Sequence, residues 1–157
     1  MLDTSFNASC LPTMADLMRI MTAEVRSFYA MARPHQMWVP RLFAVVPVGV
    51  VVLSCPDYDA DDRDRIYDDL RLKLRLLEAD CYVLAAEAWM GKAGSTLRPS
   101  QQPTRREVMI LSAADRHGAT QSAAYELIRG WSTGAVKELA ELPSGKEFTG
   151  PIFELLR

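Results

Sequence analysis

The segment Asp80–Met90, with the sequence D-C-Y-V-L-A-A-E-A-W-M, decides the fold. Its residues alternate between two faces that are both apolar, and this pattern is typical of a strand in the middle of a sheet that is covered on both sides. One residue breaks the pattern: Glu87, a carboxylate between two alanines. The sequence therefore predicts a central strand with a single charged position on one of its faces.

The composition is that of a globular protein with one core. The chain has 157 residues, of which 49% are hydrophobic and 24% charged, and this length fits a single domain. The formal net charge of -2 argues against nucleic acid as a partner. The three cysteines match no zinc or redox spacing, so we expect no metal site, no cofactor and a cytoplasmic location. The longest apolar run, 42–53, is too short to span a membrane, and we expect no membrane association.

The first helix is predicted to begin after Thr13 and to end near Ala32. Thr13 can cap the helix, and Asp16 lies three residues further on. Apolar residues then recur at helical spacing until Arg33, which precedes a proline and therefore disfavours helix. Residues 1–12 are expected to be a flexible lead-in, and 13–157 a single domain. The helix is rich in methionine, which leaves open whether its apolar stripe faces the core or a partner.

A hairpin and a second helix follow in the sequence. We expect strands at Trp38–Val46 and Gly49–Ser54, joined by a turn at Pro47 and both lying against the central strand. The second helix is predicted for 60–78 from its leucine spacing. The acidic run before it, 57–64, has the alternate aspartates of a calcium loop but lacks the required glycine. Capping of the second helix by these aspartates is the simpler interpretation.

The long segment 91–106 is predicted to be a loop without regular structure. It contains glycine, serine, glutamine and two prolines, and it has no glycine-rich phosphate-binding motif. Loops of this length are often functional. This one is basic, because its only charged residues are cations: Lys92, Arg98, Arg105 and Arg106.

The rest of the chain is predicted to form a meander of strands. The expected strands are Glu107–Ala114, Thr120–Arg129 and Ala135–Leu142, although residues 121–128 would also suit a helix. The tail after them is apolar, with two phenylalanines and two adjacent leucines at its end. We expect the tail to dock on the core or on a second copy of the chain.

These elements predict an α+β fold: one mostly antiparallel sheet of five or six strands, with two main helices. The order is one helix, two strands, one helix and then four strands. Within it, the order helix, two strands, helix, three strands resembles that of the roadblock and profilin-like families, whose members are largely binding and dimerising modules. The resemblance implies a binding role and a homodimer.

A second resemblance is local to the latter half of the chain. The E-A-W that begins at Glu87, the R-P-S…R-R-E-V of Arg98–Val108 and the closing F-T-G-P-I-F-E-L-L look like segments of short proteins of bacteriophage and prophage genomes. This resemblance implies an accessory role in a host cell and carries no catalytic residue over.

Glu87 is the sharpest candidate for a functional residue. A carboxylate in an apolar strand costs several kcal/mol unless it is paired or neutral. Glu87 can pair with Arg41, Arg105 or Arg106, it can lie at the edge of a ligand pocket beside Trp38 and Trp89, or it can act as an acid, a base or a metal ligand. The sequence leaves these three interpretations open.

Three classes of function follow from these observations, and none comes with a catalytic motif. The first is a non-enzymatic protein-interaction module, expected to be a homo-oligomer. The second is a protein that binds a small, nucleotide-like anion through Glu87, Trp89, Arg98, Arg105 and Arg106. The third is a metal-dependent hydrolase that uses Glu87 and the cluster Asp57–Asp61. The sequence favours the first class, and we assign no catalytic residue.

Overall fold

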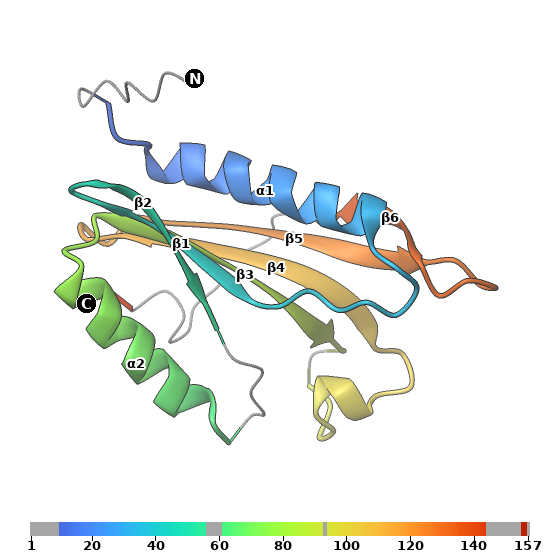
Figure 1. The fold of residues 1–157 in the computed structure, drawn as a ribbon. Coiled ribbons are helices and arrows are strands. Elements are labelled where there is room, and N and C mark those ends of the chain that lie inside the picture. Colours follow the sequence, from blue (N-terminus) through green and yellow to red (C-terminus); the bar gives the residue numbers. More distant parts are fainter. Residues whose placement is uncertain (1–9, 56–60, 93, 144–154, 157) are drawn as a thin grey trace, which may run out of the picture.

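The computed structural model describes residues 10–55, 61–92, 94–143 and 155–156. Their architecture is α+β, as the sequence predicts (Figure 1). The elements in chain order are α1 (Met14–Met31), β1 (Arg41–Val46), β2 (Gly49–Ser54), α2 (Arg63–Leu76), β3 (Cys81–Met90), β4 (Arg106–Asp115), β5 (Thr120–Arg129) and β6 (Val136–Glu141), with a short 3-10 helix at Pro99–Gln101.

Helix α1 begins where the sequence predicts because Thr13 and Asp16 cap it reciprocally. The Asp16 N–H donates to Thr13 Oγ1 (3.2 Å), and the Thr13 N–H donates to Asp16 Oδ2 (3.0 Å). This capping box satisfies two main-chain donors that have no partner inside the helix. The apolar stripe of α1 is buried against the sheet: Met18 and Met21 belong to the core and Met14 packs against it, whereas Met31 at the end of the helix is exposed.

The sheet has the strand order β2-β1-β3-β4-β5-β6, and all neighbours are antiparallel. Strand β3 is central, as predicted. Only one strand of the hairpin, β1, lies against β3, whereas β2 lies at the edge; the prediction that both lie against β3 is wrong for β2. The helix considered for residues 121–128 is also wrong, because β5 pairs with β4 on one side and β6 on the other, and this pairing overrides the local helix propensity.

The two helices cover opposite faces of the sheet (Figure 1). Alternate residues of β3 divide between two buried clusters: Val83 and Ala85 pack with α1, and Tyr82 and Leu84 pack with α2. The faces are named below the α1 face and the α2 face. Leu155 is fully buried in the α2 cluster, which agrees with the expected docking of the tail; 144–154 lie outside the described residues.

Helix α2 is shorter than predicted at both ends. Asp62 stands at its N-cap position but makes no side-chain cap, and its carboxylate lies 2.9 Å from Arg65 instead. The helix stops before Glu78, whose positive φ of 54° is incompatible with continued helix. Residues 1–9 of the expected lead-in and Asp57 and Asp59 lie outside the described residues. None of the described helices is long and apolar enough to cross a membrane.

Candidate functional site

Glu87 lies on the α1 face, beneath the C-terminal half of α1. The Tyr29 hydroxyl donates a hydrogen bond to Glu87 Oε1, and the Trp38 N–H donates to the same oxygen at 2.9 Å. The Trp38 indole N–H donates in turn to Ala85 O (2.9 Å). Two donors from the helix and the linker after it therefore satisfy the carboxylate that the sequence left unexplained.

The arginines expected as partners of Glu87 bind elsewhere. Arg41 lies 3.9 Å from Glu24 of α1, and Arg106 lies 3.2 Å from Glu126 of β5. Pairing of Glu87 with an arginine is therefore not observed among the described residues. For Arg106 the reason is geometric: it shares the α2 face with its register partner Met90, whereas Glu87 is on the α1 face.

A half-buried ion pair lies near the Glu87 cluster. Arg129 of β5 donates to Glu107 of β4 through Nε (2.7 Å) and Nη2 (2.5 Å), and its Nη1 donates to Gly134 O (3.0 Å). This two-point contact raises the pKa of the Arg129 guanidinium. Burial and the hydrogen bond to Glu87 raise the pKa of the Tyr29 hydroxyl. Each of these polar groups has a hydrogen-bond partner inside the protein. The cluster therefore anchors the end of α1 to the sheet, and none of the groups named here is left without a partner.

Sequence reasoning missed the Arg129–Glu107 pair. The available signal was that each strand carries a charged residue near the end of an otherwise apolar face. Strand register decides whether two such residues meet, and periodicity does not specify that register.

The loop between β3 and β4 is held in shape by Gln102. This side chain is only 5% exposed; its Oε1 accepts from the Lys92 N–H (2.7 Å), and its Nε2 donates to Leu97 O (3.1 Å). A Cβ on Gly91 would lie 2.5 Å from Gln102 Nε2, so a side chain there would displace the glutamine. The loop, expected to be irregular, therefore has a defined conformation with a 3-10 turn at its centre.

Three cations of this loop face solvent. Lys92, Arg98 and Arg105 are exposed, and within the described residues no carboxylate pairs with any of them. The Arg105 guanidinium lies 4.8 Å from the ring centroid of Trp89, which is itself largely exposed. The Arg105 Nη1 also donates to Ser100 O (2.8 Å), which orients the guanidinium.

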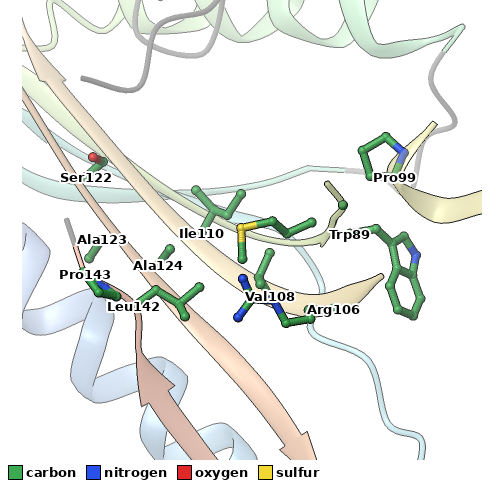
Figure 2. Close-up of a pocket in the computed structure, with 12 residues that line it drawn as sticks. Trp89, Pro99, Arg106, Val108, Ile110, Ser122, Ala123, Ala124, Leu142 and Pro143 are labelled. Atoms are coloured by element: carbon green, nitrogen blue, oxygen red, sulfur yellow. The ribbon is translucent and has the colours of Figure 1, made fainter. Parts of the chain in front are cut away.

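A pocket of about 490 Å³ adjoins the loop (Figure 2). Its walls come from the end of β3, from β4 and β5 and from the segment after β6. Trp89 and Pro99 lie at one end and Leu142 and Pro143 at the other (Figure 2). Between these two ends the lining is mainly apolar, with Ser122 and Arg106 as its polar side chains. The residues of this part are Met90, Gly91, Arg106, Val108, Ile110, Ser122, Ala123 and Ala124.

The structure brings most of the predicted ligand-binding residues to one end of the molecule. Trp89 and Arg106 line the pocket, Arg105 contacts Trp89, and Arg98 precedes Pro99 of the lining. Glu87 and Trp89 both direct their side chains to the α1 face, whereas the pocket opens on the α2 face. There Glu87 binds Tyr29 and Trp38, and the Trp89 ring stacks with Arg105. The predicted ligand-binding residues therefore divide into two groups: the arginines, which lie near the pocket, and Glu87, whose carboxylate has a structural role.

The hypothesis of a metal-dependent hydrolase finds no support among the described residues. No group of three or more histidine, cysteine, aspartate or glutamate side chains is placed there to hold a metal ion. Of the cluster Asp57–Asp61, only Asp61 belongs to the described residues, so the acidic run itself stays untested.

The two edges of the sheet differ in chemistry. Strand β2 reads G-V-V-V-L-S, with no charged residue and with Val50 and Val52 exposed. Strand β6 reads V-K-E-L-A-E, and its pairing with β5 is irregular at Arg129. Charged side chains and bulges protect sheet edges against pairing with other strands. Edge β6 carries these protective features, and edge β2 lacks them.

Comparisons with protein-family models, with curated proteins and with solved structures found no match to this chain.

Proposed function

We propose that this protein is a non-enzymatic interaction module that forms a homodimer by pairing strand β2 with β2 of a second copy. The observation that carries the proposal is that β2 has no charged residue and that no further strand pairs with it among the residues the structure describes. A second copy is the natural occupant, because an edge strand without charges can pair antiparallel with itself without placing like charges opposite each other.

The hydrogen bonds around β1 indicate which main-chain groups of β2 are available. The Cys55 N–H donates to Pro40 O (3.0 Å), so the odd-numbered residues at this end of β2 direct their main-chain groups toward β1. On the other side of β1, the Asp80 N–H donates to Val45 O (2.8 Å), which agrees with this alternation. The N–H and C=O groups of Val50, Val52 and Ser54 therefore point away from the sheet.

These outward groups suit a twofold pairing centred on Val52. Val52 would lie opposite Val52 of the second copy, and Val50 opposite Ser54, so that about six main-chain hydrogen bonds join the two sheets. Each such bond contributes roughly 1 kcal/mol net. A twofold axis perpendicular to the sheet gives one continuous sheet with both α1 helices on the same face.

The side chains near β2 add apolar surface to this pairing. Val50 and Val52 lie on the α1 face, because they pair with Val45 and Phe43 of β1, which pack with α1. Ile20 precedes Glu24 by one helical turn, and Glu24 contacts Arg41 of β1, so Ile20 lies on the β1 side of α1 and is also exposed. The exposed valines and Ile20 would be buried between the two α1 helices of the dimer.

The test is the molar mass in solution of the wild type and of Val52→Lys, by size-exclusion chromatography with light scattering over a range of concentrations. The wild type should run at twice the chain mass. The variant should run as a monomer, because two lysines would lie directly opposite each other at the twofold axis. Circular dichroism and the melting temperature should show that the variant is folded.

The matched control is Ile128→Lys, which places the same charge at an exposed β-branched position of β5. Ile128 is 39% exposed and Val52 is 55% exposed, so neither substitution buries a charge. Ile128→Lys should remain a dimer. A wild type that is monomeric at all concentrations would overturn the proposal, as would a Val52→Lys variant that still dimerises.

The bacteriophage resemblance of the latter half of the chain supports an accessory role for this module in a host cytoplasm. In that setting the dimer would present each exposed surface twice to a host component. Affinity capture from host lysate with the wild type and the monomeric Val52→Lys variant tests this role: a host protein retained only by the dimer would support it, and no retained component would contradict it.

A further inference from the structure

We infer that the pocket beside the β3–β4 loop, together with the loop's cations, binds a nucleoside phosphate. In this arrangement the base enters the pocket and the phosphate groups contact Lys92, Arg98 and Arg105. The inference rests on the pocket and the loop, which are independent of the β2 edge, so it holds or fails apart from the proposed dimer.

The pocket suits the ring of such a ligand. Its volume of about 490 Å³ is within the 300–1,000 Å³ of small-molecule sites. The strand residues that line it are mostly aliphatic, so they can pack against the apolar faces of a planar ring. The Ser122 hydroxyl can form a hydrogen bond with a polar atom at the edge of that ring. The Trp89 ring itself points away from the pocket, to the α1 face that Glu87 shares, and stacks with Arg105 (Figure 2).

The loop suits the phosphate groups. Between Gly91 and Arg105 the sequence has three cations and no carboxylate, although the whole chain is acidic. Within the described residues these cations have no acidic partner, whereas Arg106 at the end of the loop is paired with Glu126. Concentrated positive charge that the protein does not neutralise favours an anionic ligand. An arginine is the side chain best shaped for phosphate, because its guanidinium donates two parallel hydrogen bonds.

The loop is also organised before a ligand arrives. Gln102 fixes it to Lys92 and Leu97, and the Ser100 carbonyl together with the Trp89 ring orients Arg105. A site formed in advance loses less conformational entropy on binding than a loop that must first become ordered. This smaller entropy loss gives a reason for the buried Gln102 in a loop that is otherwise polar and exposed.

The experiment is isothermal titration calorimetry of the full-length protein with ATP and AMP. Adenosine serves as the ligand without phosphate, and inorganic phosphate as the ligand without a ring. The nucleotides should bind at least tenfold more tightly than either fragment. The affinity should fall as the salt concentration rises, because the loop cations are exposed.

Two variants test the two halves of the site, with one control. Arg105→Gln should weaken nucleotide binding about tenfold, since it removes a charge-assisted contact. Ser122→Leu should weaken binding by filling the pocket, without changing any charge. Arg33→Gln changes an exposed arginine in the α1–β1 linker and should bind as the wild type does.

Three results would overturn the inference. The first is no heat and no melting shift with millimolar ATP or AMP. The second is wild-type affinity in both Arg105→Gln and Ser122→Leu, each verified as folded. The third is tighter binding of a single-stranded oligonucleotide than of any mononucleotide, which would identify an extended strand as the ligand instead. Loss of binding in either folded variant, with Arg33→Gln unchanged, would support it.

Discussion

Tyr29→Phe removes one hydroxyl from the core and tests how Glu87 is held in the sheet. Tyr29 is 5% exposed, so water cannot replace the hydroxyl as a donor to Glu87. A hydrogen bond to a charged group contributes about 1.5–3 kcal/mol, and the Trp38 N–H still donates to the same oxygen in the variant. We expect a loss of about 2 kcal/mol, which for a chain of this length lowers the melting temperature by about 4–8 °C.

The pH dependence makes this prediction specific. Burial and the bond to Glu87 raise the pKa of Tyr29 in the folded state above its value of about 10 in the unfolded chain. The stability that the neutral hydroxyl contributes is therefore complete below about pH 9 and is lost as the pH rises through 10. By pH 11 the difference between the unfolding free energies of the wild type and Tyr29→Phe should therefore have shrunk by about 1.4 kcal/mol.

The assay is urea unfolding followed by circular dichroism, at pH values from 7 to 11. Burial also raises the pKa of Cys55 and of Cys81 to about 11, so both proteins lose stability at high pH through these thiols. Because the wild type and the variant share the thiols, the difference between the two unfolding free energies isolates the tyrosine.

Tyr125→Phe is the matched control. Tyr125 is a second buried tyrosine of the same cluster, and its hydroxyl makes no hydrogen bond to another described residue. Its substitution should cost less than about 0.5 kcal/mol. The reasoning is refuted if Tyr29→Phe costs no more than Tyr125→Phe at pH 7, or if its cost is the same at pH 7 and pH 11.

Three further substitutions test other parts of the structure. Thr13→Ala removes the capping box and should cost about 1 kcal/mol in thermal unfolding; an unchanged melting temperature would contradict the cap. Gly134→Ala should cost more than Gly94→Ala, because both glycines have positive φ but only the new Cβ at 134 would lie 2.5 Å from the His35 ring. Equal costs would contradict that contact. Gln102→Ala should release the β3–β4 loop, seen as faster cleavage there by trypsin with the strands still folded, and unchanged cleavage would argue against its role.

The sequence predicts the elements of this protein better than their arrangement. Both ends of helix α1 are predicted correctly, because the signals that set them are neighbours in the sequence: Thr13 and Asp16 at the start, and the proline after Arg33 at the end. The length of β3 follows from its alternation. The position of β2 at the edge of the sheet is not predicted, since β1 and β2 are both apolar and periodicity does not specify the order of strands.

The same distinction applies to the candidate site. Glu87 stands out in the sequence because it interrupts an apolar strand, but its partners Tyr29 and Trp38 are 58 and 49 residues away, so only the packing of α1 identifies them. Trp89, Arg105 and Arg106 are predicted together because the loop is basic and follows the strand. Gln102 is missed, because nothing in a run of polar loop residues distinguishes the one that is buried.

Hydrogen exchange of the β2 amides tests the central claim, that this edge pairs with a second copy. The measurement is the exchange rate of each β2 amide by NMR, in concentrated protein and in the Val52→Lys variant. Val51 and Leu53 donate toward β1 and should exchange slowly in both proteins. The account predicts that Val50 and Ser54, whose N–H groups point outward, exchange slowly in the wild type and rapidly in the variant. Rapid exchange at Val50 and Ser54 in concentrated wild-type protein would contradict it.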